Sequence, residues 1–289
     1  MNSNDHTSNP SALAPDREGG GLFAVLGNPL GQSLSPVMQT AAFAKIGIAA
    51  RYSACQTDNA AEAVRRFREM GLRGASVTLP FKETIMPLLD EVDPDARKIG
   101  AVNTIVRRNG RLEGYNTDGP GLVRDLEEWA GVISGKSFVV LGAGGAARAA
   151  LFSIARAGGT PIVVNRSPQR AEALASHFGC RWVPIAEICH LQADCLINST
   201  PVGMYPEAER TPLPKSELDH FSHVMDMVYN PLKTRLLWEA EAAGCAVHTG
   251  IGMFVHQGAE QFRLWTGLEP PRDIMRRAVM ERLGKNDGD

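Results

Sequence analysis

A lysine stands directly after a buried strand pattern in the stretch SVTLPFK, residues 76–82. The apolar pattern predicts a strand that runs to Leu79 and breaks at Pro80, which places Lys82 just past the break. In α/β proteins, ligands collect at the carboxyl ends of the strands. A lysine there can donate a proton to a carbonyl oxygen, or accept one from a hydroxyl if its pKa is lowered. The alternative is a solvated lysine on a short helix over residues 81–89.

Other polar residues lie at comparable positions in the first half of the chain. Ser33 and Ser35 precede an apolar-periodic run, so two hydroxyls and the free amides of a helix start could bind an anion such as a carboxylate. Ser35 could equally be only the N-cap of that helix. Thr78 lies near the carboxyl end of the predicted strand, Asn103 lies in AVNT, and Asp118 follows a predicted hairpin. Asparagine and aspartate are also ordinary turn residues, and spacing alone brings none of these groups together.

A glycine-rich turn marks a second candidate site. The pattern G-x-G-x-x-A begins at Gly142, directly after a predicted strand over 137–141 and at the start of a predicted helix. In such a turn the backbone amides can approach a pyrophosphate, and the helix start supplies positive potential. The residues of the turn that we expect to contact a dinucleotide are Gly142, Ala143, Gly144, Gly145 and Ala146. The alternative is a tight turn without a ligand.

The next predicted strand, PIVVN, ends where such a fold selects its cofactor. An NAD site normally has a carboxylate here for the ribose 2′-hydroxyl, but this chain has Asn165 followed by Arg166, with Arg170 one turn later. Guanidinium groups suit a 2′-phosphate. The sequence therefore predicts NADP as the cofactor.

Apolar runs alternate with helical patterns from Leu22 onward, which predicts an α/β fold with mainly parallel sheets. Asn109-Gly110 between two alternating strands predicts a hairpin. A helix over 119–130 then leads to the glycine turn, where a second, Rossmann-type doubly wound domain begins.

Composition excludes several classes of function. The net charge is −2 and no run of basic residues exceeds two, which argues against partners such as nucleic acid or a membrane surface. The five cysteines have no C-x-x-C spacing, and His220 and His223 have no third ligand in register, so no metal site is expected. No stretch is long and apolar enough to span a bilayer, and the polar residues 1–20 predict a disordered tail on a cytoplasmic protein.

The motifs together resemble the shikimate dehydrogenase family. They are NPLGQSLSP, SVTLPFK, AVNT, GYNTD, GAGGAARA, NRS, DMVYNP and GMFVHQGAEQF, in the family's order and across nearly the whole chain after the tail. The resemblance implies NADPH-dependent, reversible reduction of 3-dehydroshikimate to shikimate, in the pathway to aromatic amino acids. It implies Lys82 as the catalytic acid/base and Asp118 as its partner.

The resemblance also assigns the remaining site residues and the domains. Its implied substrate-binding residues are Ser33, Ser35, Thr78, Lys82, Asn103, Asp118, Tyr229 and Gln257, and Met227 and Gly250 would approach the cofactor. The chain would return to its first domain at the end. The expected division is a substrate domain of residues 21–118 and 251–289 and an NADP-binding Rossmann domain of residues 119–250, in a monomer or homodimer.

Three positions depart from the family pattern: Gln32, Pro201 and Arg235. Because Gln32 borders the proposed carboxylate site and Pro201 lacks a backbone donor, the substrate could instead be quinate or an amino-substituted analogue. Two other classes remain open. One is a dinucleotide-binding sensor without catalysis, and the other is a thiol-dependent reductase, for which Cys55 is the one cysteine in the substrate domain.

Overall fold

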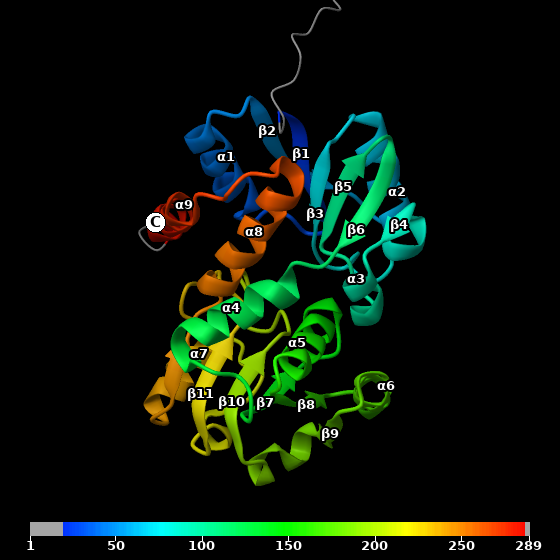
Figure 1. Ribbon diagram of the computed structural model, residues 1–289. Coiled ribbons are helices and arrows are strands. Elements are labelled where there is room, and N and C mark those ends of the chain that lie inside the picture. The colour runs from blue at the N-terminus through cyan, green and yellow to red at the C-terminus, as the bar shows by residue number, and fades with distance from the viewer. Residues whose placement is uncertain (1–19, 287–289) are drawn as a thin grey trace, which may run out of the picture.

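The structure is a computed structural model that describes residues 20–286, and it contains two six-stranded sheets joined by helices (Figure 1). The predicted tail, apart from Gly20, lies outside the described residues. Within residues 20–286, no helix has both the length and the apolar character needed to cross a membrane.

The first sheet is mixed, with the strand order β2-β1-β3-β5-β6-β4. Its strands are β1 (Gly21–Gly27), β2 (Ala50–Gln56), β3 (Gly74–Val77), β4 (Glu91–Val92), β5 (Thr104–Arg108) and β6 (Arg111–Tyr115). Strands β2, β1 and β3 pair in parallel, as do β6 and β4, whereas β5 is antiparallel to both neighbours. The β5–β6 hairpin turns at Asn109-Gly110, both with positive φ, as predicted.

Two details of the SVTLPFK segment differ from the prediction. Strand β3 ends at Val77 rather than Leu79, whose side chain is 40% exposed. The predicted helix over 81–89 is wrong, because the segment forms turns and a short 3₁₀ helix, η1 (Met86–Leu88). Pro87 accounts for this, since it has no N–H to give and its ring would collide with a carbonyl one turn earlier in an α-helix.

Helices cover both faces of the first sheet. They are α1 (Ser35–Ile46), α2 (Ala60–Glu69) and the short α3 (Pro94–Ile99). Asn59 caps α2 by accepting a hydrogen bond from the Glu62 N–H, as the spacing of the two residues predicts. In a full capping box the Glu62 carboxylate would in turn bind the Asn59 N–H, but here it accepts from the Asp58 N–H instead.

The second sheet is entirely parallel, with the order β12-β11-β10-β7-β8-β9. Its strands are β7 (Ser137–Leu141), β8 (Thr160–Asn165), β9 (Arg181–Pro184), β10 (Ala193–Asn198), β11 (Phe221–Asp226) and β12 (Ala246–His248), and its connections include α5 (Gly145–Arg156), α6 (Pro168–Phe178), α7 (Arg235–Ala242) and the 3₁₀ helices η2 (Ile185–His190) and η3 (Lys215–Glu217). This is the doubly wound order of a dinucleotide-binding fold, whose ligand crevice lies at the carboxyl ends of the neighbouring strands β7 and β10, where the strand order reverses.

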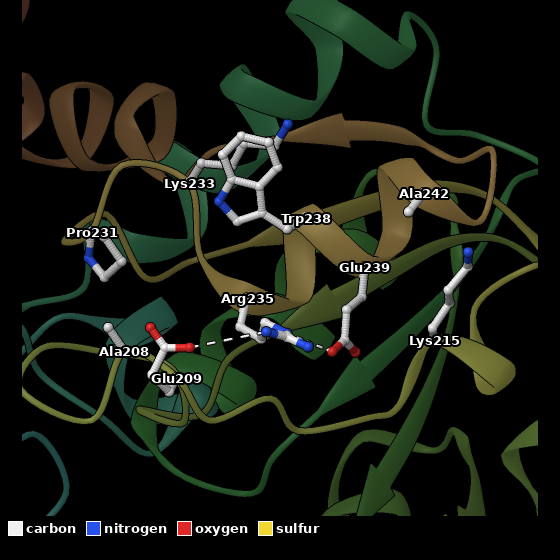
Figure 2. Close-up of a pocket in the computed structure, with 9 residues that line it drawn as sticks. All are labelled: Ala208, Glu209, Lys215, Pro231, Lys233, Arg235, Trp238, Glu239 and Ala242. Atoms are coloured by element: carbon white, nitrogen blue, oxygen red, sulfur yellow. Dashed lines mark hydrogen bonds and ion pairs between the residues drawn. The ribbon is translucent and has the colours of Figure 1, made fainter.

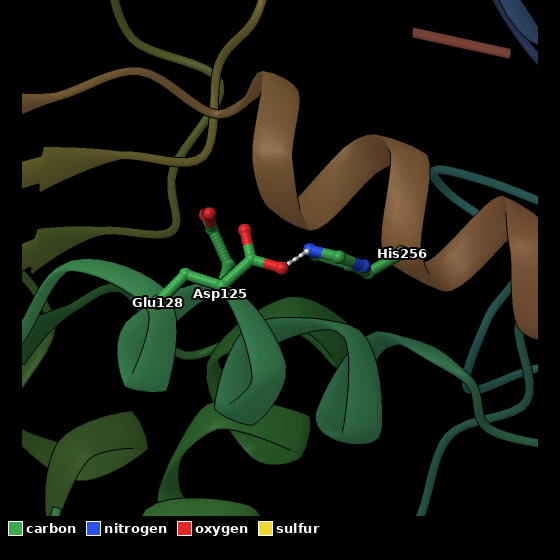
Figure 3. Close-up of side chains that lie close together, drawn as sticks. All are labelled: Asp125, Glu128 and His256. Atoms are coloured by element: carbon green, nitrogen blue, oxygen red, sulfur yellow. Dashed lines mark ion pairs between the residues drawn. The ribbon is translucent and has the colours of Figure 1, made fainter. Parts of the chain in front are cut away.

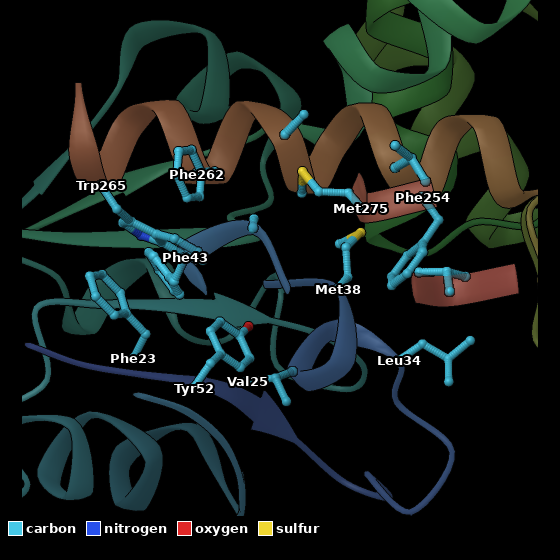
Figure 4. Packing of buried hydrophobic residues seen from close by; sticks show 14 of the residues in the cluster. Phe23, Val25, Leu34, Met38, Phe43, Tyr52, Phe254, Phe262, Trp265 and Met275 are labelled. Atoms are coloured by element: carbon cyan, nitrogen blue, oxygen red, sulfur yellow. The ribbon is translucent and has the colours of Figure 1, made fainter. Parts of the chain in front are cut away.

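Two helices cross between the sheets and pack against each other, α4 (Asp118–Ala130) and α8 (Ile251–Thr266) (Figure 1). Helix α8 then closes the core of the first half, where Phe262 lies against Phe43 and the Trp265 indole donates a hydrogen bond to the Ile105 carbonyl (Figure 4). The last helix, α9 (Arg272–Asn286), packs on α1. The last described helix thus lies beside the first.

Candidate functional site

All eight expected substrate-binding residues line one cavity of about 140 Å³ between the two halves. Ser33 and Ser35 come from the start of α1, Thr78 and Lys82 from the segment after β3, and Gln257 from α8. Three residues expected at the cofactor, Ala146, Met227 and Gly250, line the same cavity. The structure therefore places the two groups of predicted residues next to one another.

Lys82 and Asp118 form the charged centre of this cavity. The Lys82 ammonium donates a hydrogen bond to Asp118 Oδ2 at 2.6 Å, and the Asn103 amide donates to Oδ1 at 2.8 Å. Asp118 is only 4% exposed and lies in the first turn of α4, where the helix dipole favours a negative charge. The carboxylate thus fixes the lysine from one side while both of its oxygens are satisfied.

A glycine of the second half makes room for the lysine. A Cβ atom built on Gly145 would lie 2.9 Å from Lys82 Cβ, which is closer than real side chains approach. Gly145 is the first residue of α5, at the end of the glycine turn. Contact between the lysine stem and this turn brings the acid/base candidate to the edge of the proposed dinucleotide site.

Ser35 is not an N-cap. Helix α1 begins with Ser35 itself, and its capping position is Leu34, which makes no side-chain hydrogen bond to the helix. Because Ser35 is buried and lines the cavity with Ser33, its hydroxyl is placed to meet a ligand.

A buried hydrogen-bond chain beneath the cavity was missed from the sequence. The Tyr52 hydroxyl donates to Ser76 Oγ, and Ser76 donates to Gln261 Oε1, both at 2.6 Å. Gln261 in turn donates to the Asn103 carbonyl at 3.2 Å. Ser76 lies two residues before Thr78 and Gln261 one helical turn after Gln257, so the periods of strand and helix could have found both.

The segment after β11 closes the cavity from the second half. Tyr229 stacks on Phe254 with ring centroids 4.2 Å apart, and burial raises the pKa of the Tyr229 phenol to about 12. Asp226 holds the start of this segment, since its carboxylate accepts hydrogen bonds from the Asn198 amide, the Val228 N–H and the Thr234 hydroxyl. Tyr229 is therefore a neutral hydrogen-bonding group at neutral pH.

The glycine turn leads into α5 with an open outer face. Gly142 has φ +118°, which side-chain-bearing residues rarely adopt, and the backbone enters α5 without a side-chain cap. A Cβ on Gly144 would meet no atom within 4 Å, so the outer face of the turn is open. The free amides at the start of α5 fit an anionic group at this place.

The two predicted 2′-phosphate ligands are available on the surface. Arg166 follows the end of β8 directly, Arg170 lies in the first turn of α6, and both side chains are exposed. Neither guanidinium has a hydrogen bond or ion pair within the part of the chain that the structure describes. Both are free to bind an anion.

The departures from the family pattern have structural partners. Gln32 Oε1 accepts a hydrogen bond from the Asn230 amide at 3.0 Å, which ties the first half to the segment after β11. Arg235 pairs with Glu239 at 2.6 Å and with Glu209 at 3.9 Å, at a surface pocket of about 590 Å³ (Figure 2). That pocket shares no lining residue with the cavity around Lys82. Pro201 lies in the loop after β10.

Cys55 does not suit a thiol-dependent reductase. It lies in β2 with its side chain in the core, and burial raises the pKa of its thiol. A nucleophilic cysteine requires the opposite shift. Among the histidines, His223 contacts His248 rather than His220, with 3.1 Å between ring nitrogens.

Comparison with known proteins agrees with this arrangement. The family model described as the shikimate dehydrogenase substrate binding domain matches residues 25–105, and that of the shikimate 5′-dehydrogenase C-terminal domain matches residues 250–280. The shikimate dehydrogenase (NADP(+)) of Moorella thermoacetica is 44% identical over 281 residues, which cover 93% of this chain and 95% of that protein. The chain belongs to the shikimate dehydrogenase family.

Solved structures extend the comparison to ligand complexes. The shikimate 5-dehydrogenase of Thermus thermophilus, in complex with NADP(H) and shikimate, superposes with a TM-score of 0.82 at 43% identity and covers 90% of this chain and 98% of its own. A ligand-free 5-ketofructose reductase of a Gluconobacter strain has a TM-score of 0.77 at 31% identity, covering 91% and 99%. The same fold thus occurs in reductases named for different substrates.

Proposed function

We propose that this protein is an NADP-dependent shikimate dehydrogenase, which reversibly reduces 3-dehydroshikimate to shikimate. The observation that carries this proposal is the hydrogen-bonded Lys82–Asp118 pair in a small polar cavity whose other wall is the glycine turn of a doubly wound fold. In this proposal residues 21–118 and 251–289 bind the substrate, and residues 119–250 bind the cofactor. Membership of the family supports the same substrate and cofactor.

Different residues of the cavity would bind the different polar groups of a hydroxylated ring acid. Ser33 and Ser35, at the start of α1, would bind the carboxylate, because their hydroxyls and the free amides of the helix can all donate to it. Thr78, Asn103 and Gln257 offer hydrogen bonds for ring hydroxyls. Tyr229 would close the site from the second half.

Lys82 performs the proton transfer in this mechanism. When bound, NADPH would supply a hydride to the ketone carbon. The Lys82 ammonium donates its proton to the oxygen on which negative charge develops, and Asp118 keeps the ammonium directed at that oxygen. In the reverse direction, neutral Lys82 accepts the proton of the hydroxyl.

The cofactor would lie along the turn Gly142–Ala146, with its pyrophosphate at the start of α5. Asn165 would face the adenosine ribose, and Arg166 and Arg170 would bind the 2′-phosphate. Met227 and Gly250, which line the cavity beside Lys82, would contact the nicotinamide end.

The decisive experiment is a steady-state assay of NADPH oxidation with 3-dehydroshikimate, repeated with Lys82→Ala. General acid catalysis is worth about 10²- to 10⁴-fold, so this variant should lose kcat by that factor with a much smaller rise in KM. A variant with near-normal kcat would remove Lys82 from the mechanism. A wild-type protein that binds NADPH but turns over no substrate would instead be a dinucleotide-binding sensor.

Substrate choice needs a second comparison, because Gln32 directly precedes Ser33 and accepts a hydrogen bond from Asn230 of the second half. Values of kcat/KM for shikimate, quinate and an amino-substituted analogue, each measured with NADP and with NAD, separate the alternatives. We expect shikimate with NADP to give the highest value. A higher value for quinate would reassign the protein within its family without changing the reaction.

A further inference from the structure

Three metal-ligating side chains meet between the two crossing helices, outside the cavity around Lys82. Asp125 and Glu128 lie one turn apart on α4, and His256 faces them from α8 (Figure 3). One ligand atom from each of the three lies within 4.8 Å of the other two. Spacing alone could not show this group, because α8 is far from α4 in the sequence.

His256 is buried without a hydrogen-bonding partner. The residue is 7% exposed, and neither ring nitrogen makes a hydrogen bond of acceptable geometry. Its Nε2 lies 2.9 Å from Glu128 Oε1, yet this contact is an ion pair only if the ring is protonated. Its Nε2 therefore faces the carboxylates from a buried position without a well-aligned hydrogen bond.

Asp125 is a buried carboxylate that accepts a hydrogen bond from the Met253 N–H at 2.9 Å. Its carboxylate occupies the space that a Cβ on Gly252 would fill. Arg124 and Arg276 lie near enough to act on the cluster electrostatically, but neither forms an ion pair with it among residues 20–286. Two carboxylates and an imidazole therefore share a site to which neither arginine is directly bound.

We propose that Asp125, Glu128 and His256 form a binding site for a divalent first-row transition metal such as Zn²⁺. One imidazole nitrogen and two carboxylate oxygens are ligands that Zn²⁺ takes at about 2.0–2.2 Å, and metal-bound ligands then lie about 3–4 Å apart. The 2.9 Å between His256 Nε2 and Glu128 Oε1 is already close to this separation. The Glu128 side chain is half exposed, which gives the ion a path from solvent.

A metal at this site would fasten α4 to α8. Both helices carry residues of the candidate active site, Asp118 on α4 and Gln257 on α8. Asp125 lies seven residues after Asp118, about 10 Å along the helix, so the ion would not touch the substrate. It would stabilise the crossing of the two halves without joining the chemistry.

The test is metal binding by the full chain after removal of metals with a chelator. Titration calorimetry with Zn²⁺ and visible absorption with Co²⁺ should both report one ion per chain, and the ion should raise the thermal midpoint. His256→Gln and Glu128→Gln should each weaken binding at least tenfold. The exposed Cys189 is replaced in every protein by Cys189→Ser, to remove an adventitious thiolate ligand.

His223→Gln is the matched control, because it removes a half-buried imidazole that lies outside the proposed site, where it contacts His248. It should bind Zn²⁺ with unchanged affinity and give an unchanged Co²⁺ spectrum. The proposal is overturned if the wild-type site binds neither ion, or if His256→Gln binds as tightly as the control. Glu128→Gln, at a half-exposed side chain, keeps the test valid if the buried substitution disturbs folding.

Discussion

At the scale of single residues, the molecule brings together a lysine, a carboxylate and an amide that the chain delivers from separate segments. Asp118 serves two neighbours at once, Lys82 through Oδ2 and Asn103 through Oδ1. The residue types and their places at strand ends could be predicted from the sequence. Their meeting could not be predicted from spacing and was expected only from the family resemblance, since it depends on how the segment after β3 and the start of α4 approach across the first sheet.

Asp118→Asn tests whether this carboxylate acts through the lysine. The change keeps the shape but removes the charge that directs the ammonium, so kcat should fall by about 10²-fold or more, with a smaller change in KM. Residues that act as one unit are not additive. The double variant with Lys82→Ala should therefore be scarcely slower than Lys82→Ala alone, and a fully additive loss would mean that the two act independently.

Arg166 should decide between the two nicotinamide cofactors. Its guanidinium is exposed and unpaired within residues 20–286, at the end of β8 where the 2′-phosphate is expected. Arg166→Ala should raise KM for NADPH about tenfold or more while changing KM for NADH little, because charged hydrogen bonds are worth about 1.5–3 kcal/mol. Arg181→Ala, an exposed arginine on β9, serves as the control. Equal effects on both cofactors would contradict the assignment.

At the scale of elements, regular patterns were predictable and interruptions were not. The β5–β6 hairpin and the glycine turn follow from φ requirements that only a few residues meet. The helix expected over 81–89 fails because one proline outweighs the surrounding helix-forming residues. The Tyr52–Ser76–Gln261 chain was missed because each residue looked like an ordinary part of a strand or helix, and only packing of α8 on the first sheet joins them.

Ser76→Ala tests the role of that chain. Removing the hydroxyl leaves the Tyr52 phenol and the Gln261 amide oxygen without their 2.6 Å partner, at a cost of about 1–3 kcal/mol for buried polar groups. Because Ser76 and Gln261 line the cavity, we expect KM for shikimate to rise several-fold with kcat less affected. Ser76→Thr, which keeps the hydroxyl, should restore most of the affinity. A loss of stability with unchanged KM would make the chain purely structural.

At the scale of the whole molecule, two halves with separate cores share one cavity and two crossing helices. The glycine turn predicted that the second sheet belongs to the doubly wound class, because such a turn is typical of these folds. The return of α8 and α9 to the first half had no signal in periodicity or spacing. The return was predicted only from the resemblance of whole motifs to the family, because amphipathic helices can cover either sheet equally well.

The stability of the whole fold should depend on pH through two aspartates whose pKa values shift in opposite directions. Burial raises the pKa of Asp226, at the end of β11, to about 7, whereas hydrogen bonds from Ser137 lower the pKa of Asp194, at the start of β10. Between about pH 4 and 7 the unfolded chain has released the Asp226 proton and the folded chain has not. The free energy of unfolding therefore decreases as pH rises through this range because of Asp226. Asp194 instead contributes stability above about pH 4 that is lost in acid.

Asp226→Asn and Asp194→Asn form a matched pair for this prediction. Measured by urea unfolding from about pH 4 to 8, Asp226→Asn should gain stability relative to the wild type as pH rises, on the order of a few kcal/mol by the upper end. Asp194→Asn should be less stable than the wild type at neutral pH, and the difference should shrink toward the acid end. Parallel curves for the wild type and Asp226→Asn would show that the three hydrogen bonds to Asp226 offset its burial and keep the carboxylate charged throughout.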